Sequence, residues 1–238
     1  MSTIAENIAN VRERIQRAAA VADREPDTIT LMAVSKTRPA SAIRDAWAAG
    51  VQNIGENYLQ EALEKMALLS DLPLTWHFIG PIQSNKTKTI AEHFDWVHSV
   101  DRLKIARRLS DQRPEHLPPL NVCLQINISG EDSKSGVSLT ELPELAAAVA
   151  QLPRLCLRGL MAIPAPAETS PERRAPLAAL REAQAALALP LDTLSMGMSD
   201  DLAEAIQEGA TMVRIGSALF GARDYPTTNT HSERGSTK

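Results

Sequence analysis

The feature of this sequence that most restricts its fold is a regular alternation of short apolar runs with longer amphipathic runs. Eight apolar runs of four to nine residues are predicted to be strands, and several are apolar at nearly every position. Such continuous runs are typical of parallel strands that are covered on both faces of their sheet. The predicted strands span 29–35, 51–54, 76–79, 96–100, 120–128, 155–163, 191–196 and 212–215.

Amphipathic runs rich in Ala, Leu and Glu separate these strands and are predicted to be helices. They span 40–49, 58–69, 85–94, 102–112, 139–152, 172–187 and 200–208. One more helix is predicted near the N-terminus, where Thr3 and Glu6 have the spacing of a capping box. Eight strands separated by seven helices within about 220 residues fit an α/β fold, a single (β/α)8 TIM barrel with an additional N-terminal helix.

The main competing fold is a doubly wound open sheet, which usually has fewer strands than this chain offers. Its dinucleotide-binding form requires a G-x-G-x-x-G turn, and the sequence contains none. Gly216 and Gly221 have the spacing of a P-loop, but Ala222 stands where that loop needs a lysine. We therefore expect one barrel domain over residues 1–224, followed by a disordered tail, 225–238, rich in Thr, Ser and Asn.

The charge balance excludes several classes of partner. The 238-residue chain has 25 Lys and Arg residues against 29 Asp and Glu residues, which gives a formal net charge of −4. This balance lacks the basic field that draws proteins to nucleic acid or to anionic lipid. No apolar stretch approaches the roughly 18 residues of a membrane span. No signal peptide is recognised, so a cytoplasmic protein is expected.

The cysteines and histidines give no sign of a redox or metal centre. Cys123 and Cys156 both lie in predicted strands, and reduced thiols in the core are favoured over a redox pair. Together with five scattered histidines, they do not form a zinc-ligand spacing, so no metal is expected.

Polar side chains follow the predicted strands, at the end of a barrel where function is normally located. Ser199 follows the seventh strand, and Gly216 and Ser217 follow the eighth. Backbone N–H groups at the helix starts after these two strands form the usual phosphate site of this fold. A phosphate site is favoured, and the alternative for Ser199 is an ordinary helix cap. Arg214 points from the eighth strand toward the same region, or else pairs with a buried acid.

Lys36 directly follows the first strand, where a lysine is unusual after a buried apolar run. One interpretation is a surface lysine at the rim of the barrel. The other is an amine whose pKa is lowered by desolvation and by Arg38, which prepares it to form a Schiff base. His77 is interpreted as a hydrogen-bonded core histidine in preference to a ligand-stacking ring. Asn57 and Asn127 are either turn residues or ligand-orienting amides.

Six separate motifs, in order along the chain, resemble one protein family. They are Ala-Val-Ser-Lys-Thr-Arg-Pro at 33–39, Ile-Gly-Glu-Asn-Tyr at 54–58, His-Phe-Ile-Gly at 77–80 with Gln-Ser-Asn-Lys at 83–86, Gly-Leu-Met-Ala-Ile-Pro at 159–164, Ser-Met-Gly-Met-Ser-Asp-Asp at 195–201 and Val-Arg-Ile-Gly-Ser-Ala-Leu-Phe-Gly at 213–221. This set resembles the pyridoxal phosphate homeostasis proteins, the YggS/PROSC family. The resemblance implies a single barrel like the N-terminal domain of alanine racemase, pyridoxal 5′-phosphate (PLP) as the cofactor, and no established catalytic activity.

The resemblance also implies roles for single residues, none of them catalytic. Lys36 would form the Schiff base, and Arg214 would face the pyridine nitrogen. The other cofactor contacts would be Asn57 and His77 beside the ring, and Ser199, Gly216 and Ser217 around the phosphate. Because an arginine side chain cannot accept a proton, it would leave that nitrogen unprotonated and weaken the electron withdrawal on which amino-acid turnover depends.

Two further positions bear on this resemblance. Arg38 stands where the family has a second lysine, and an arginine cannot form an imine, so an aldehyde-handling role is not carried over to it. Lys134 matches a lysine proposed in the family as a secondary PLP contact.

These features together predict a protein of intracellular PLP homeostasis. It would hold PLP on Lys36 and buffer it or deliver it to apo PLP-dependent enzymes, without turning over amino acids. The alternative is a PLP-dependent amino-acid racemase, which requires a second base opposite Lys36, and the sequence offers only Tyr58 and Tyr225 as tyrosines for that role. A Schiff-base aldolase acting on a phosphorylated sugar is a third possibility. A monomer is expected.

Overall fold

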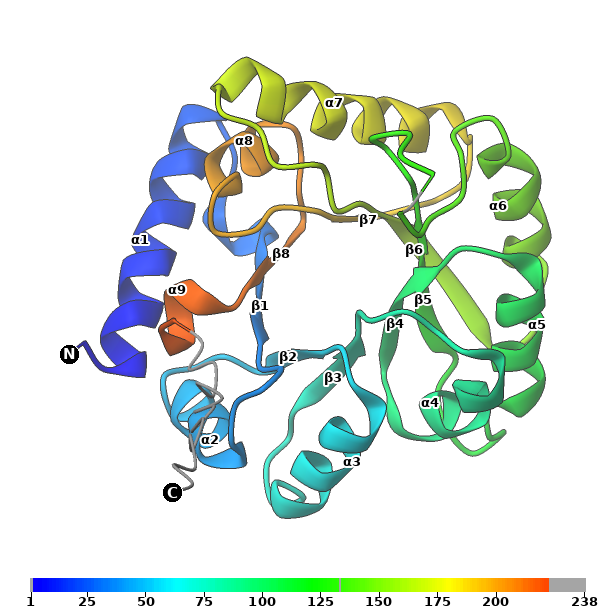
Figure 1. Ribbon diagram of the computed structural model, residues 1–238, viewed down its shortest axis with the longest axis horizontal. Coiled ribbons are helices and arrows are strands. Elements are labelled where there is room, and N and C mark those ends of the chain that lie inside the picture. The colour runs from blue at the N-terminus through cyan, green and yellow to red at the C-terminus, as the bar shows by residue number, and fades with distance from the viewer. Residues whose placement is uncertain (1, 133, 223–238) are drawn as a thin grey trace, which may run out of the picture.

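The described part of the chain folds into a closed barrel of eight parallel strands, as the alternation predicts (Figure 1). The computed structural model describes residues 2–132 and 134–222, so the predicted tail, 225–238, lies outside the described residues. The strands are β1 (Thr30–Val34), β2 (Asn53–Glu56), β3 (Thr75–Phe78), β4 (Trp96–Val100), β5 (Leu120–Gln125), β6 (Leu155–Met161), β7 (Thr193–Ser195) and β8 (Met212–Ile215). They follow one another around the barrel in chain order, and β8 pairs with β1 to close it.

Helices surround the barrel and cover the outer faces of the strands (Figure 1). They are α1 (Ile4–Val21), α2 (Ala40–Ala48), α3 (Leu59–Leu68), α4 (Thr87–His93), α5 (Leu103–Gln112), α6 (Leu142–Ala150), α7 (Ser170–Ala186), α8 (Leu202–Gln207) and α9 (Ser217–Phe220), with short 3-10 helices η1 (Pro26–Thr28) and η2 (Ser84–Lys86). Helices α2 to α8 lie between consecutive strands, where the amphipathic runs predict them. The predicted N-terminal helix is α1.

One boundary differs from the prediction at a place that matters for the site. Helix α8 begins at Leu202, two residues later than the amphipathic run indicates. The Met198 N–H donates to the Asp201 carboxylate at 2.7 Å, and this contact holds residues 199–201 in a turn. Ser199 therefore lies in the loop after β7 and is not the cap of a helix.

Helix α1 packs against α8 and α9, which come from the other end of the described chain (Figure 1). It begins with the predicted capping box, because the Glu6 N–H donates to the Thr3 hydroxyl at 3.1 Å and the Thr3 N–H donates to the Glu6 carboxylate at 2.8 Å. Ile8, Val11 and Ile15 form its buried face. The burial of this apolar face is the main force that holds α1 against the barrel.

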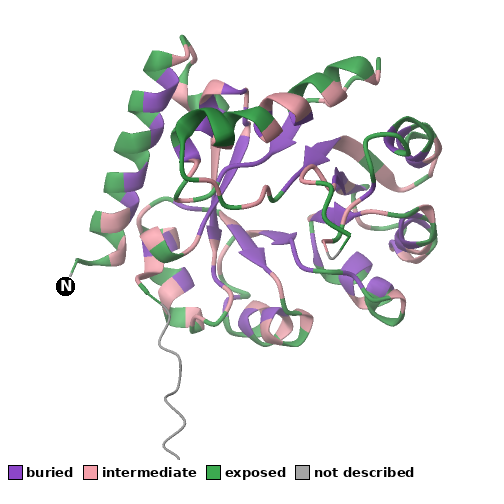
Figure 2. Ribbon diagram, turned by 45° about the horizontal axis from the view of Figure 1, so that its top comes forward, coloured by how far each residue is buried: buried purple, intermediate pink, exposed green. Residues whose placement is uncertain are grey.

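The buried residues form two layers (Figure 2). The larger hydrophobic cluster lies between the strands and the helices that cover them. A smaller cluster of Met32, Ile79 and Met212 lies inside the barrel. His77 and His98 share that interior and are fully buried. The inside of the barrel is therefore partly polar, whereas most barrels of this kind are filled by branched apolar side chains.

The prediction of two core thiols is correct for only one of them. Cys123 on β5 is buried, and burial raises the pKa of its thiol to about 12, so it is chemically inert near neutral pH. Cys156 on β6 is exposed, because the first half of that strand is only partly covered.

Residues 2–132 and 134–222 offer neither a metal-ligand cluster nor a membrane-spanning helix. Within these ranges no group of three or more His, Cys, Asp or Glu side chains is arranged to hold a metal ion. The helices of the same ranges are all too short or too polar to cross a membrane.

Candidate functional site

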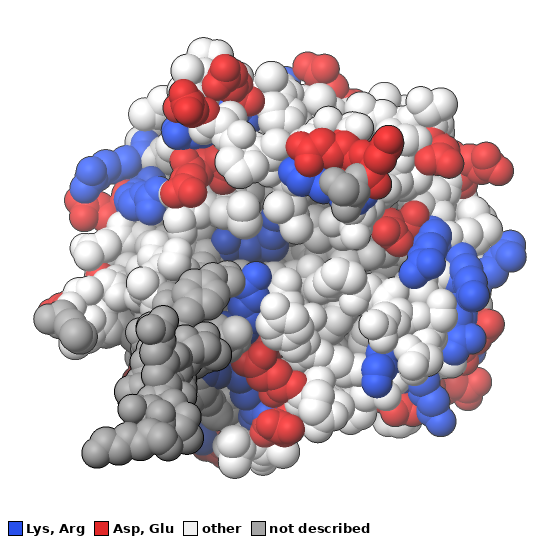
Figure 3. All heavy atoms as spheres, viewed as in Figure 1, with Lys and Arg blue, Asp and Glu red and all other residues white. Residues whose placement is uncertain are grey.

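A cavity of about 270 Å³ lies at the carboxyl ends of the strands. It is lined by six of the seven residues that the sequence predicts to bind the cofactor, namely Lys36, Asn57, Ser199, Arg214, Gly216 and Ser217. The rest of the lining is Val34, Ile79, Ile163, Met198 and Asp200. Figure 3 shows Lys and Arg side chains near the centre of this end of the barrel, with Asp and Glu side chains both next to them and farther out. The volume suits a small ligand, since pockets for drug-sized molecules begin at about 300 Å³.

The pairing of the strands explains why these residues meet. β1 pairs with β2 on one side and, through Ala33 and Ile215, with β8 on the other. Lys36, Asn57 and Gly216 each follow one of these three strands, and neighbouring parallel strands end at the same edge. The barrel closure thus brings an amine from the start of the chain beside a glycine from its other end.

Gly216 is not required by backbone conformation, because its φ of −115° is available to any residue. A Cβ at this position would lie 3.4 Å from the Val34 carbonyl oxygen, which is an ordinary contact. The fold would therefore accept a small side chain here. Because glycine has no side chain, the backbone at this position is open to the cavity, and an anion could approach it closely.

Arg214 reaches the cavity from β8, and its guanidinium is held by the barrel wall. Nη1 donates to the carbonyl and hydroxyl oxygens of Ser195 at 2.7 and 2.9 Å, and Nη2 donates to the Ala162 carbonyl at 2.9 Å. Burial lowers the pKa of Arg214 to about 10, so the side chain remains a cation near neutral pH. These three bonds use three of its five N–H donors, which leaves donors for a ligand.

Arg214 is also the first member of a hydrogen-bonded chain that crosses the interior of the barrel. The Ser195 hydroxyl lies 2.8 Å from Nδ1 of His98, and Nε2 of His98 lies 2.9 Å from Nδ1 of His77. Nε2 of His77 lies 2.8 Å from the side-chain oxygen of Asn53. That oxygen can only accept, so each histidine donates through Nε2 and accepts at Nδ1. The chain therefore runs in one direction, from Arg214 to Asn53.

His77 is the predicted site residue that the structure places away from the cavity. It is fully buried inside the barrel, where its ring stacks on Trp96 with the ring centroids 5.5 Å apart. Burial lowers the pKa of His77 to about 3, and burial together with the charges of His77 and Arg214 holds the pKa of His98 well below its usual range. This geometry fits the interpretation of His77 as a core histidine, and its contact with a cofactor ring stays a prediction.

The loop after β7 carries Ser199 to the cavity and is fixed by several contacts. Near its start lies Gly197, whose φ of +103° favours glycine. Besides the bond from Met198 to Asp201, the Ser199 carbonyl accepts a hydrogen bond from Arg14 of α1 at 2.6 Å. Burial raises the pKa of Asp201. The additional N-terminal helix thus helps to fix the position of a residue in the candidate site.

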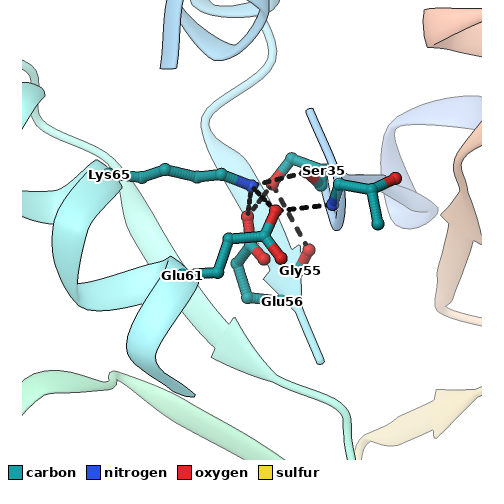
Figure 4. A network of polar contacts seen from close by, with 6 residues as sticks. Ser35, Gly55, Glu56, Glu61 and Lys65 are labelled. Atoms are coloured by element: carbon teal, nitrogen blue, oxygen red, sulfur yellow. Dashed lines mark hydrogen bonds and ion pairs between the residues drawn. The ribbon is translucent and has the colours of Figure 1, made fainter. Parts of the chain in front are cut away.

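Three charged residues beside Lys36 were missed in the sequence analysis. Nζ of Lys65 on α3 lies 2.7 Å from a carboxylate oxygen of Glu56 at the end of β2, and 2.7 Å from one of Glu61 (Figure 4). Lys65 and Glu56 are buried. The signal that could have found them is a glutamate directly after an apolar strand, together with an acid and a base four residues apart on the next predicted helix.

The remaining sequence candidates lie around the cavity. Arg38 donates to the carbonyls of Gly221 and Ala222 at 2.6 and 2.9 Å, so it ties the segment after α9 to the β1 exit. Asn127 and Lys134 line a second cavity of about 320 Å³, which shares three lining residues with the first.

The arrangement has a clear chemical character. One primary amine and one guanidinium line a small cavity together with Ser, Gly and Asn residues, four apolar residues and Asp200. The side-chain oxygen of Asn57 is buried there, with no hydrogen-bond partner among the described residues. An anionic carbonyl compound matches this set, because the amine can condense with the carbonyl and the cation and backbone can bind the anion.

Comparison with known proteins places the chain among relatives of one kind. The family model described as alanine racemase, N-terminal domain, matches residues 4–224. A protein of Pseudomonas aeruginosa named pyridoxal phosphate homeostasis protein is 69% identical over 225 residues, which covers 94% of this chain and 98% of the relative. A protein of Escherichia coli with the same name is 59% identical over 234 residues, which covers 94% and 99%.

Solved structures include similar proteins at two levels of identity. PipY of Synechococcus elongatus with PLP bound has a TM-score of 0.81 at 41% identity, covering 92% of this chain and 100% of that chain. Alanine racemase from Corynebacterium glutamicum has a TM-score of 0.67 at 21% identity, covering 94% of this chain and 62% of that chain. At this identity the second likeness shows the fold alone.

Proposed function

This chain belongs to the family of the alanine racemase N-terminal domain, within it to the pyridoxal phosphate homeostasis proteins, and we propose that it binds PLP and serves intracellular PLP homeostasis. The observation that carries this proposal is the meeting of Lys36 and Arg214 with the β7 and β8 exit loops in one cavity. A relative at 41% identity over the whole barrel has been solved with PLP bound.

The lining residues fit PLP group by group. The Lys36 amine would condense with the aldehyde of PLP, with loss of one water, and hold it as a Schiff base. Ser199, Gly216 and Ser217 would bind the phosphate through hydroxyl and backbone N–H groups. Asn57, whose side-chain oxygen is buried without a partner among the described residues, would contact the ring substituents. PLP would supply a reactive aldehyde, and the residues of this chain would supply the amine, the cation and the phosphate contacts.

Arg214 supports a holding role over a catalytic one. Its guanidinium is fixed by Ser195 and Ala162 and retains N–H donors for the pyridine nitrogen. A donor facing that nitrogen leaves it unprotonated, which limits the electron withdrawal that amino-acid chemistry needs. Both curated relatives are named homeostasis proteins, and we propose that this chain likewise holds and delivers PLP without turning over amino acids.

The racemase alternative has less support from the site. Racemisation needs a second base on the face of the substrate opposite Lys36. Tyr58 is 54% exposed and stands outside the lining of the cavity, and Tyr225 lies outside the described residues.

The deciding experiment is the absorption spectrum of the purified protein, before and after borohydride reduction. We expect a yellow protein whose Schiff-base band disappears on reduction, with the reduced cofactor mapped to Lys36. Lys36→Ala should lack the band. A cofactor fixed mainly on Lys86 or Lys134 would refute the assignment of Lys36, and a protein that stays colourless with added PLP would refute PLP binding through an imine.

A further inference from the structure

A network of charged side chains, buried except for Glu61, lies beside the loop that carries Lys36 (Figure 4). Lys65 Nζ donates to the Ser35 carbonyl, to Glu56 and to Glu61, each at 2.7 Å. Glu56 also accepts a hydrogen bond from the Ser35 hydroxyl at 2.5 Å. The network thus joins the ends of β1 and β2 to helix α3.

The same network holds the backbone on both sides of Lys36. Before it, the Ser35 carbonyl accepts from Lys65. After it, the Thr37 N–H donates to Glu61 Oε1 at 2.5 Å. The residue proposed to carry the cofactor therefore lies between two backbone groups that are fixed by one set of charged side chains.

Thr37 shows that this loop has an uncommon conformation. Its φ is +64°, in the left-handed region that β-branched residues rarely adopt. Such a conformation persists only where surrounding contacts determine it. Here the Thr37 N–H donates to the Glu61 carboxylate, and that carboxylate also accepts a hydrogen bond from Lys65.

We propose that Glu61, supported by Lys65 and Glu56, is a positioning residue for Lys36: its hydrogen bond with the Thr37 N–H keeps the β1 exit loop in the left-handed conformation that presents the Lys36 amine to the cavity. This inference rests on the proposed PLP function. It predicts that losing the acceptor at position 61 impairs imine formation, while the phosphate-binding loops after β7 and β8 stay intact.

The test uses two ligands and four variants of the full chain. PLP reports the imine, and pyridoxine 5′-phosphate, which has an alcohol in place of the aldehyde, reports the phosphate and ring contacts alone. Glu61→Ala should weaken PLP binding at least about fivefold, because the strained conformation of Thr37 would lose the contact that maintains it. This factor corresponds to the low end of the free-energy cost of a strained backbone residue. The same variant should leave pyridoxine 5′-phosphate binding unchanged. Glu61→Gln keeps the acceptor oxygen and should bind PLP nearly as the unchanged protein does.

The most specific part of the test is the rescue of PLP binding by a second substitution. Glycine adopts a φ of +64° without steric cost, so adding Thr37→Gly to Glu61→Ala should restore much of the lost PLP affinity. The matched control is Asp71→Ala, which removes the exposed pair of Asp71 with Arg44 beyond the end of α3 and should leave PLP binding unchanged. Glu61 is partly exposed, so Glu61→Ala should fold, and unfolding by urea checks this.

Equal weakening of both ligands by Glu61→Ala, or no rescue by Thr37→Gly, would overturn the inference. A loss in Glu61→Gln as large as that in Glu61→Ala would also overturn it, because the acceptor would then be irrelevant. These results are separate from the proposed function, which fails only if the unchanged protein forms no imine on Lys36.

Discussion

Arg214 donates to both the carbonyl and the hydroxyl oxygen of Ser195, at 2.7 and 2.9 Å, and so fixes the rotation of that hydroxyl. The hydroxyl hydrogen is then directed at His98, 2.8 Å away. Every group in this chain of hydrogen bonds has a defined donor or acceptor role. The hydrogen-bonded chain is therefore rigid and sensitive to the removal of any member. The residue that would face the cofactor nitrogen is thus fixed by hydrogen bonds to neutral groups of Ser195 and Ala162.

Ser195→Ala should lower both stability and PLP affinity. It deprives the buried Nδ1 of His98 of its donor and removes one acceptor from Arg214. The free energy of unfolding should fall by about 1–3 kcal/mol, the cost of leaving a buried polar group unsatisfied. Urea unfolding and PLP titration measure the two effects. Unchanged values in both would mean that the chain does not position Arg214.

The buried histidines predict a loss of stability in acid. The pKa of His77 is about 3 in the folded protein, against about 6.5 in the unfolded chain. Between these values the unfolded chain binds more protons, so the free energy of unfolding should fall as pH drops below about 6.5. The slope should reach about 1.4 kcal/mol per pH unit for each neutral histidine, His77 and His98.

Urea unfolding at several pH values between 7 and 5 measures this slope. The variant His77→Gln should show about half of it, because one of the two groups no longer titrates. Glu56 has the opposite effect on the free energy of unfolding. Burial raises the pKa of its carboxyl group, so protonation of Glu56 stabilises the folded protein as the pH falls, most strongly at the low end of this range. A flat profile above pH 5 in the unchanged protein would contradict the assignment of two neutral buried histidines.

The fold could be predicted from the sequence because each of its parts is signalled locally. Apolar runs mark the strands, and the Thr3–Glu6 spacing marks the first helix. Lys36, Ser199, Arg214 and the 216–217 pair could be placed at one end because parallel strands in a barrel all end there. The lining of the candidate cavity is therefore largely predictable from the residues at and just after the ends of the strands.

The rest depends on contacts between residues far apart in the sequence. His98 and Ser195 are 97 positions apart, and no periodicity pairs them. The exposure of Cys156 depends on how the helices cover β6, which the strand itself does not reveal. The late start of α8 follows from a single side-chain bond to Asp201. Such contacts are set by tertiary packing, so they appear only when the chain is folded.

Two glycines of the site should respond differently to substitution. Gly216→Val should abolish PLP binding and leave the barrel folded, because position 216 has an ordinary φ and room for a Cβ against Val34. Gly197→Ala should lower the free energy of unfolding by at least about 1 kcal/mol. Its φ is +103°, and its Cβ would lie 2.7 Å from that of Ala205. Circular dichroism and PLP titration on the same samples decide this, and loss of secondary structure in Gly216→Val would make Gly216 a folding residue.

The phosphate should contribute much of the affinity through the loop of Ser199. Ser199→Ala should weaken PLP binding by about 1–3 kcal/mol, the range for a lost hydrogen bond to a charged group. Pyridoxal, which lacks the phosphate, should bind to the unchanged protein far more weakly than PLP does. Its affinity for Ser199→Ala should equal its affinity for the unchanged protein. If pyridoxal and PLP bind with the same affinity, these loops do not hold the phosphate.

Delivery of PLP to other proteins can be tested directly. The cavity lies at the end of the barrel, and the rim residues Ile163 and Met198 are 42% and 40% exposed. An incoming amine could therefore reach PLP held on Lys36. Displacement of the Lys36 amine by that amine would transfer PLP in a reversible exchange that needs no energy source. Mixing PLP-loaded protein with an apo PLP-dependent enzyme should restore that enzyme's activity.

Amino-acid turnover should be absent in the same preparation. Arg214 would offer an N–H donor, and not a carboxylate, to the cofactor nitrogen. Tyr58 stands outside the cavity lining, so it is poorly placed to act as a second base. A carbanion on a bound amino acid would therefore gain little stabilisation and have no base on its far face. Incubation of the PLP-loaded protein with L-alanine, assayed for the D-enantiomer and for keto acid, tests this directly. A site without a second base should turn over amino acids far more slowly than an ordinary enzyme. Turnover at about 1 s⁻¹ or more would therefore refute the delivery role and indicate a racemase or transaminase.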